Sequence, residues 1–204
     1  MKREKISVTT PDGYTVKVPA QLLATAVIAA IFGQTSSILP TAPAALPANT
    51  DSVPEVGEYW PGQGGHNAGF VPARDGVPAH YLIVAAKDIG DHKWGRYGEE
   101  SGGTSRTDGL ANTACLLNDG NHPAASACAE YQADGHGDFY LPAAAELYQC
   151  WLYTQHLFAK DCWYWSSTQR SANLAFGLVF GVGFQLGHGK DLELRVRPVR
   201  RLFI

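Results

Sequence analysis

The chain has 204 residues, of which 45% are hydrophobic and 17% are charged, a composition typical of an ordered globular protein rather than a disordered one. Its formal net charge is −3, and Lys and Arg do not cluster as they do in proteins that neutralise a phosphate backbone, so we expect no nucleic-acid partner. The 22 glycines and 12 prolines favour a loop-rich domain with short elements.

The N-terminal segment changes from strand-like to helical periodicity. Apolar and polar residues alternate over Ile6–Val18 on either side of the turn signal Pro11-Asp12-Gly13, a pattern that predicts a β-hairpin. Apolar residues then recur at helical spacing over Pro19–Phe32, and Gly33 ends the run. We therefore predict that residues 1–33 form a hairpin–helix module for attachment or oligomerisation.

No charged residue occurs between Lys17 and Asp51, so a membrane role of this module is an alternative. The run Pro19–Phe32 is shorter than the roughly 20 apolar residues that a membrane span needs, and Gln21 and Thr25 interrupt it. A signal peptide fits poorly because an acid-containing hairpin, and no short basic lead, precedes the run. We favour a helix packed against its own hairpin, a partner protein or a symmetry mate.

Residues 34–56 differ in composition from both neighbours. Pro, Ala, Ser and Thr dominate this stretch, which contains Pro40, Pro43, Pro47 and Pro54 and favours extended backbone without a core. We interpret it as a linker, so that residues 1–33 and 57–204 have separate roles.

The segment 57–204 shows the pattern of an α+β domain. We expect a strand at Tyr81–Ala86, a helix that begins after Asp108 as its N-cap, a helical patch at Ala124–Tyr131, and the strongest helix from Pro142 to Phe158. Further strands are predicted at residues 163–167, 175–180, 183–186 and 194–202. This order favours two main helices segregated from a short-stranded antiparallel sheet.

Several motifs in this segment occur together and in a particular order. They are Tyr59–Gly65, Asp108–Thr113, Asp138–Pro142 followed by Glu146-Leu147, Tyr164–Thr168 and Arg195–Arg201. Together they resemble the Lcl-type branch of the C-type-lectin-like fold, which is related to the formylglycine-generating-enzyme fold and is common in phage tail-associated proteins. The resemblance extends from about Gly57 to the C-terminus.

The resemblance implies a compact scaffold with a variable surface on a phage tail fibre or tail tip. We expect a virion protein, made in the host cytoplasm, that recognises a host-surface receptor, either protein or glycan. Residues 1–33 would then contact other tail proteins. A homo-oligomer, such as a trimer, is expected because repetition converts weak contacts into avidity. The alternative is a structural virion decoration or fibre-connecting protein that binds no receptor.

The chain departs from the better-known members of the fold in two ways. It lacks the Glu-Pro-Asn, Gln-Pro-Asp and Trp-Asn-Asp signatures that bind calcium in sugar-binding members. No cysteine follows Cys162, whereas the formylglycine-generating enzymes need a late reactive pair. We therefore expect no calcium, no cofactor and no enzymatic activity.

The cysteines and histidines give weak signals of their own. Cys115, Cys128, Cys150 and Cys162 allow three pairings and form no CxxC motif, so buried free thiols and one disulfide both stay open. The seven histidines form no HxH or HxxxH pair, and we predict no metal site.

Two charged clusters admit a structural and a functional interpretation. The stretch Asp134–Asp138 could hold an acid/base or calcium site, but we favour a turn that leads into the helix after Pro142. Arg195, Arg197, Arg200 and Arg201 could form a basic patch. Arg195 and Arg197 share one strand face, and we favour ion pairs to nearby carboxylates or a solvated face over a binding patch.

The predicted binding surface lies between the two most family-like strand motifs, in the hairpin region Gln169–Asp191. Its candidate ligand-binding residues are Gln169, Arg170, Ser171, Asn173, Leu174, Val182, Gln185, His188, Lys190 and Asp191. Strand alternation would bury the opposite set, Phe176, Leu178, Phe180 and Phe184. The alternative is a solvated hairpin without a ligand.

Overall fold

The computed structural model describes residues 5–9, 15–19, 53–74 and 76–204. The chain divides into two compact units, Met1–Asn49 and Thr50–Ile204. In the first unit, β1 (Lys5–Thr9) pairs antiparallel with β2 (Thr15–Pro19). The predicted helix that follows and the linker up to residue 52 lie outside the described residues.

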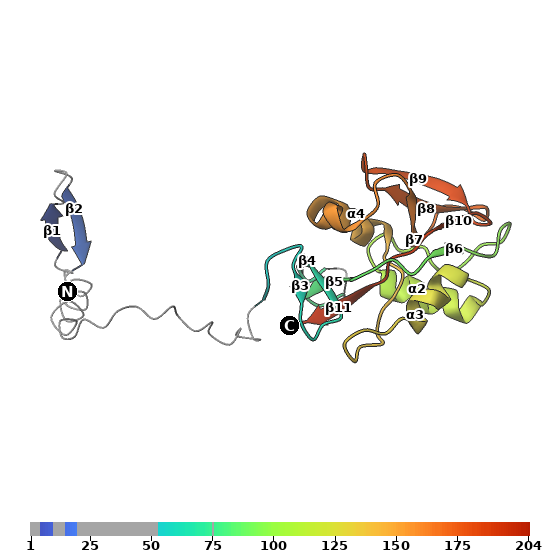
Figure 1. Cartoon of the computed structure of the whole chain (residues 1–204), viewed down its shortest axis with the longest axis horizontal. Helices are drawn as coiled ribbons and strands as arrows, with labels where there is room; N and C mark the ends of the chain where they lie inside the picture. The colour runs from blue at the N-terminus through green and yellow to red at the C-terminus, as the bar shows by residue number, and fades with distance from the viewer. Residues whose placement is uncertain (1–4, 10–14, 20–52, 75) are drawn as a thin grey trace, which may run out of the picture. The chain divides into compact units, whose positions relative to one another are not determined.

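The second unit contains two sheets, shown with their labels in Figure 1. The five-stranded sheet has the order β6 (Asp91–Lys93), β10 (Glu193–Arg195), β7 (Trp163–Gln169), β8 (Leu174–Val179) and β9 (Phe184–Gly189). The four-stranded sheet has the order β11 (Val199–Phe203), β5 (His80–Ala85), β4 (Gly65–Val71) and β3 (Tyr59–Trp60). The pairings are antiparallel except that β10 runs parallel to β7.

Three helices complete the unit, α2 (Gly109–Asp119), α3 (Pro123–Glu130) and α4 (Ala144–Thr154). The α2 helix begins where the sequence predicts, because the Asp108 carboxylate accepts a hydrogen bond from Ala111 N at 3.1 Å. The α3 helix begins at a proline, whose missing N–H is tolerated in a first helical turn. At the start of α4 the bond runs the other way: Ala143 is the N-cap, and its N–H donates to the carboxylate of Glu146 in the first turn at 2.8 Å. The second unit is therefore an α+β structure.

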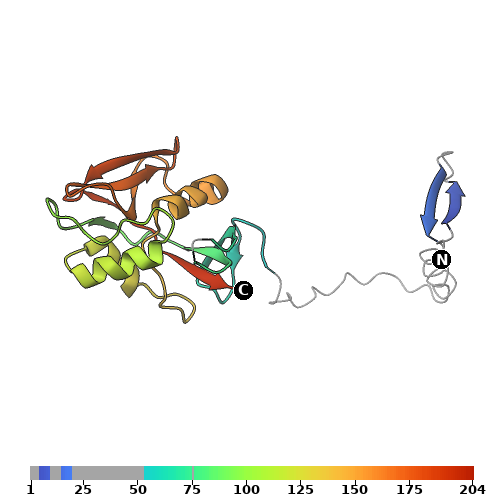
Figure 2. The ribbon, with the colours of Figure 1, turned by 180° about the vertical axis from the view of Figure 1, so that it is seen from behind.

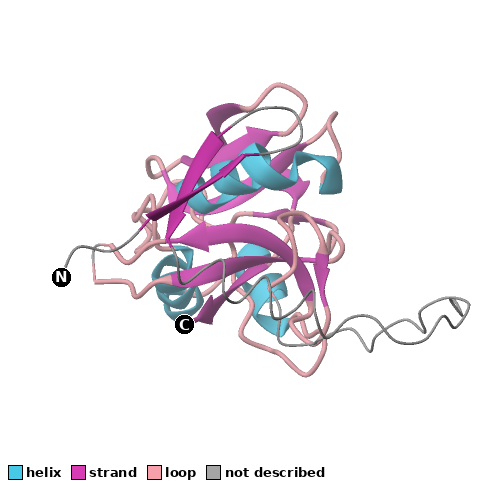
Figure 3. Cartoon of the chain, turned by 90° about the vertical axis from the view of Figure 1, so that its left-hand side faces the viewer, coloured by secondary structure: helices cyan, strands magenta, loops and turns pink. Residues whose placement is uncertain are grey.

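The core consists of two clusters that lie on opposite faces of the five-stranded sheet. Tyr164 and Leu178 point to the face covered by α4 and the four-stranded sheet, where they pack with Leu147. Trp165 points to the other face and packs with Leu116 of α2 and residues of α3. Figures 2 and 3 show helices flanking the strands on both sides.

This arrangement corrects three expectations. The helical patch expected at Ala124–Tyr131 is a full helix, α3, so the described part of the second unit has three helices rather than two main ones. They are not segregated on one side of the strands. The helix after Pro142 ends at Thr154, and a 3-10 turn over Gln155–Leu157 leads out of it, so Phe158 lies beyond.

The predicted strand 194–202 is two strands, β10 and β11, which belong to different sheets. Pro198 has no N–H to donate to a ladder and lies between them, so the chain can change sheets there. The Arg197 guanidinium stabilises the crossing by donating to the carbonyls of Ala85 and Ala86 at 2.8 Å each. None of the described helices is long and apolar enough to cross a membrane.

Candidate ligand-binding surface

The β8–β9 hairpin forms one edge of the five-stranded sheet, and β9 is the edge strand. The two strands pair from Leu174↔Gly189 to Val179↔Phe184, and a turn at residues 180–183 joins them. The predicted binding residues therefore lie at both ends of this hairpin and along β9.

Three of the predicted binding residues make hydrogen bonds within the protein. Gln169 and Lys190 are buried, and their side chains bond to each other, with 2.6 Å between Lys190 Nζ and Gln169 Oε1. Lys190 also donates to Glu99 O at 2.7 Å and lies over the Trp94 ring, 4.6 Å from its centroid. Gln185 donates to Ala144 O at 2.8 Å and so faces α4. These side chains hold loops and helix in place, which corrects the expectation that they are exposed.

The remaining candidates at the open end of the hairpin differ in their exposure to solvent. Arg170 is exposed and lies 5.9 Å from the centroid of the half-buried Phe176 ring. Ser171 and Leu174 are partly buried and close the β7–β8 turn through a 3.2 Å bond from Leu174 N to Ser171 Oγ. Asn173 and Asp191 are exposed.

His188 lies on the face of β9 that points away from α4. Its ring centroid is 4.2 Å from that of Trp163, and its buried Nε2 has no hydrogen-bond partner within the part of the chain that the structure describes. Burial lowers the pKa of this imidazole. The imidazole thus packs against an aromatic surface.

Phe184 was expected to be buried, but 63% of it is exposed. The predicted alternation continues straight through the turn, whereas the pairing Val179↔Phe184 places Phe184 on the face opposite Leu178. Leu178 and Phe180 are fully buried as predicted. Leu186 shares the exposed face of Phe184, and Val182 is exposed in the turn. We call Val182, Phe184 and Leu186 the hairpin surface.

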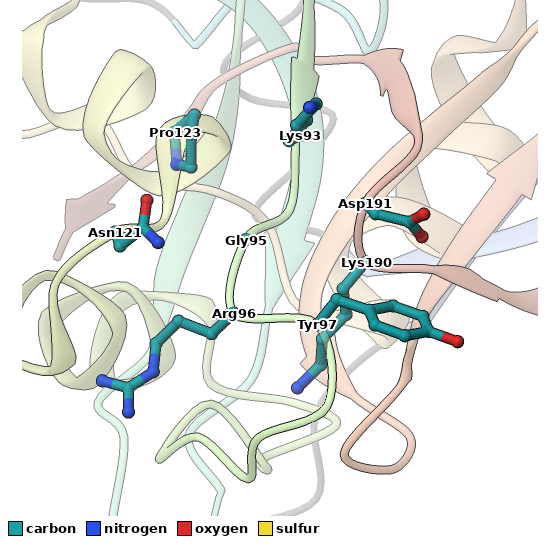
Figure 4. A pocket seen from close by; sticks show the side chains of 8 residues that line it. All are labelled: Lys93, Gly95, Arg96, Tyr97, Asn121, Pro123, Lys190 and Asp191. Carbon is teal, nitrogen blue, oxygen red and sulfur yellow. The ribbon is translucent and has the colours of Figure 1, made fainter.

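Beside the far end of β9 lies a cavity of about 290 Å³, shown in Figure 4. Its lining includes Lys190 and Asp191, which the sequence singles out, and Lys93, Tyr97 and Asn121, which it does not. Lys93 is the last residue of β6, Tyr97 lies in the loop that follows it, and Asn121 lies in the α2–α3 loop. These residues are distant in sequence and come together only in the tertiary structure. No local sequence pattern therefore indicates the cavity.

The cluster Asp134–Asp138 is a structural clamp in this fold. The Asp134 carboxylate accepts from Gly62 N and Gly64 N at 3.1 Å each and from Tyr59 Oη at 2.7 Å. These hydrogen bonds lower the pKa of Asp134 and raise that of Tyr59 to about 12. Asp138 pairs with Arg200 at 2.8 Å. The carboxylates are therefore already engaged by the protein itself.

The C-terminal arginines also form ion pairs, as favoured from the sequence. Arg195 contacts Asp91 at 2.6 Å, and Arg197 contacts Asp88 at 3.3 Å. Arg201 is buried and contacts both Asp108 and Glu146. These guanidinium groups are committed to the fold.

One hydroxyl–imidazole pair raises the question of catalysis. Ser101 Oγ lies 3.3 Å from His122 Nε2, and His122 Nδ1 lies 2.9 Å from Trp94 O. Both side chains are buried, and burial lowers the pKa of His122. A backbone carbonyl occupies the place that an orienting carboxylate takes in a Ser-His-Asp triad. The pair ties the α2–α3 loop to the segment after β6.

All four cysteines are free thiols, of which Cys128 and Cys150 are buried. Among the described residues, no group of three or more His, Cys, Asp or Glu side chains is arranged to hold a metal ion. No protein-family model matches the chain, and no curated protein matches it.

Proposed function

We propose that this chain is a ligand-binding protein of a phage tail fibre or tail tip, which recognises a host-surface receptor and catalyses no reaction. In this proposal its second unit is a calcium-independent C-type-lectin-like domain of the Lcl type, and residues 1–33 attach it to other tail proteins in a homo-oligomer. The sequence motifs at Tyr59–Gly65, Asp138–Pro142 and Arg195–Arg201 support the family assignment.

The observation that supports binding best is the hairpin surface. Val182, Phe184 and Leu186 are 59%, 63% and 51% exposed, respectively, although large apolar side chains are ordinarily buried. Exposed apolar patches on a folded protein mark interaction sites, and aromatic residues dominate the binding energy of interfaces. The opposite face of the same hairpin is anchored to α4 through Gln185, so the surface is presented on a fixed support.

The test measures saturable binding of the labelled full chain to susceptible host cells. We expect Phe184→Ser to raise the apparent Kd about 30-fold, the equivalent of roughly 2 kcal/mol for an interface hot spot. Leu152→Ser on α4 is the matched control, because Leu152 is 53% exposed and lies outside the hairpin surface. Circular dichroism and thermal unfolding of both variants check that they fold.

The alternative is that the hairpin surface packs against a neighbouring virion protein. Wild-type chain that shows no saturable binding to cells but enters particles, while Phe184→Ser does not enter them, would establish decoration and overturn receptor recognition. Equal cell binding by wild type and Phe184→Ser would remove the hairpin surface from the binding site.

A further inference from the structure

The open edge of β9 is the longest sheet edge in the described part of the second unit. β9 has six residues and ends the five-stranded sheet, where Figure 1 shows it at the rim. The other end strands are shorter, with three residues in β6, two in β3 and five in β11. Part of the β11 edge is also taken, because Val199 exchanges hydrogen bonds with Tyr140 at 2.8 and 3.0 Å. A free strand edge can pair with a strand of another chain, and β9 is the edge best suited to do so.

The direction of the backbone groups along β9 follows from its pairing with β8. Lys190 N donates to Asn173 O at 3.0 Å, which marks this pair as a hydrogen-bonded one that continues the β8–β9 register. Hydrogen-bonded and non-hydrogen-bonded pairs alternate along an antiparallel ladder. Every second residue of β9 therefore directs its N–H and C=O to the open edge, namely Gln185, Gly187 and Gly189. Gly189 O already accepts from Leu192 N at 3.0 Å. Both groups remain open at Gln185 and Gly187, which lie on either side of Leu186.

These open groups are placed symmetrically, as pairing with a second copy of the same strand requires. A twofold axis at Leu186 would bring an antiparallel copy alongside, with Gln185 of each chain opposite Gly187 of the other. Each such pair exchanges two N–H···O bonds. Four hydrogen bonds would then satisfy every open N–H and C=O of Gln185 and Gly187 in both copies.

The side chains of β9 match in the same register. Leu186 would lie opposite Leu186 of the second copy, and Phe184 opposite its His188, on the face of the sheet that points away from α4. These are non-hydrogen-bonded pairs, in which the Cα atoms approach to about 4.5 Å and the side chains are in closest contact. Cross-strand pairs of aromatic and apolar residues stabilise a sheet. Pairing would therefore cover part of Leu186 and Phe184, which are 51% and 63% exposed.

β9 also lacks the features that usually prevent pairing at a sheet edge. Natural edges carry charged residues, prolines or bulges. β6 has Asp91 and Lys93, and β11 has Arg200 and Arg201, whereas Phe184–Gly189 contains no charged residue and no proline. Its register with β8 is regular from end to end. We propose that two copies of this chain pair through their β9 edges, antiparallel and with the twofold axis at Leu186, so that the two hairpin surfaces become one.

Disulfide trapping in the full chain tests the register. In Leu186→Cys the two new thiols would lie on Cα atoms about 4.5 Å apart, within the range that a disulfide spans. Val182→Cys is the matched control, because Val182 is 59% exposed but would lie roughly 26 Å from its counterpart. Both variants carry Cys115→Ser, since Cys115 is the exposed native thiol. After oxidation with copper–phenanthroline, we expect covalent dimers from Leu186→Cys and almost none from Val182→Cys.

Amide hydrogen exchange followed by NMR tests the pairing without a new thiol. A six-residue edge is a small interface, so the pairing should be weak and is measured in a concentrated solution. Gly187→Pro removes a donor that points to the open edge, and the atoms nearest a Cβ there belong to the exposed Arg170 side chain, which can move. We expect the Gln185 amide to exchange about tenfold or more faster in this variant than in wild type. The Leu186 amide, which points to β8, should stay protected in both and so reports that the hairpin is folded.

Three results would overturn the proposal: no dimer from Leu186→Cys, as much dimer from Val182→Cys, or a Gln185 amide that exchanges equally fast in wild type and Gly187→Pro. Protection of Gln185 only after a receptor or another tail protein is added would assign the edge to a foreign strand and overturn self-pairing. The pairing does not depend on receptor recognition. Dimers without saturable cell binding would contradict the proposed function alone, and cell binding by wild type without dimers of Leu186→Cys would contradict the edge pairing alone.

Discussion

At the scale of single residues, the Glu146 carboxylate accepts four hydrogen bonds from described residues. It is 3% exposed, its Oε1 accepts from Tyr140 Oη and Arg201 Nη2 at 2.8 Å each, and its Oε2 accepts from Ala143 N and Gly109 N. One side chain therefore joins the starts of α2 and α4 to β11. Because Arg201 is buried too, the carboxylate also compensates a charge removed from water.

We predict that Glu146→Ala lowers the free energy of unfolding by about 3–5 kcal/mol, the usual cost of leaving one partner of a buried ion pair uncompensated. The expected loss of unfolding free energy lies toward the lower end of this range, because Asp108 also contacts Arg201 and still compensates its charge in the variant. Chemical denaturation measures the change. Glu130→Ala, at an exposed position on α3, should change stability by less than about 0.5 kcal/mol. Similar values for both variants would contradict the buried network.

Four histidines, of which His80 and His122 are buried and His66 and His188 are half-buried, make stability depend on pH. Burial lowers the pKa of His66, His80, His122 and His188 in the folded state, whereas in the unfolded chain an imidazole titrates near 6.5. Below about pH 6.5 the unfolded chain therefore binds more protons than the folded one. Stability should be complete above that pH and should fall as the solution is acidified.

His188→Phe tests the contribution of one such group, because the new ring can keep the contact with Trp163. We predict that the variant matches wild type near neutral pH and loses less stability between about pH 6.5 and pH 5.5, by at most about 1.4 kcal/mol per pH unit for one proton. Urea denaturation at several pH values measures both slopes. Identical slopes would show that His188 titrates alike in the folded and unfolded states.

At the scale of elements, Gly95 joins three loops. The Gly95→Ala variant would combine strain at φ 103° with a methyl group 2.1 Å from Asn121 O, so part of the backbone must move. Gly120 also has positive φ, at 74°, but a Cβ there meets no atom within 4 Å. An alanine at either position would carry the conformational cost of a positive φ. Only at Gly95 would it also clash with a neighbouring atom.

We predict that Gly120→Ala costs about 1–3 kcal/mol from strain alone and that Gly95→Ala costs more. Thermal unfolding of the two variants compares them directly. Gly95→Ala should also change the amide signals of Lys190 and Asn121, which contact it across the loops. An equal loss of Tm in both variants would mean that the loops accommodate the extra methyl group.

The helices and the strands β5, β7, β8 and β9 of the second unit could be predicted because their signals are local, whereas the sequence pattern does not indicate β3, β4 or β6. Asp108 as N-cap and the period-2 pattern of Trp163–Ser167 each report on their own neighbours in the chain. The division of 194–202 into two strands depends instead on which sheet each half pairs with. That pairing involves β5 and β6, which lie far back in the sequence.

The candidate site was predicted less well for the same reason. Alternation along β9 cannot be continued from β8, since the number of residues in the turn decides which face each side chain takes. Phe184 was therefore placed inside and Gln185 outside, the reverse of what the structure shows. Lys93, Tyr97 and Asn121 come together only after β6, the loop that follows it and the α2–α3 loop have folded together, so no short motif could indicate their cavity.

At the scale of the whole second unit, the five-stranded sheet lies between the two core clusters. Tyr164 and Leu178 belong to one cluster, and Trp165 and Ala175 of the same strands belong to the other. Each of the strands β7 and β8 contributes side chains to both clusters. Loss of packing in one cluster should therefore disrupt the packing of the other cluster. The unit should therefore unfold as one cooperative structure.

Two free buried thiols report on the clusters separately, since Cys150 lies in the first and Cys128 in the second. Burial raises the pKa of Cys150 to about 12 and that of Cys128 as well, so neither thiol reacts while its cluster is intact. We predict that both become reactive at the same urea concentration. Leu178→Ala and Leu116→Ala, which each should cost about 2–5 kcal/mol, should shift both thiols together. Pulsed alkylation with mass spectrometry makes the measurement. If Leu178→Ala exposed Cys150 alone, the clusters would be independent units, and the hairpin surface and the cavity lined by Lys93, Tyr97 and Asn121 would rest on separately folding supports.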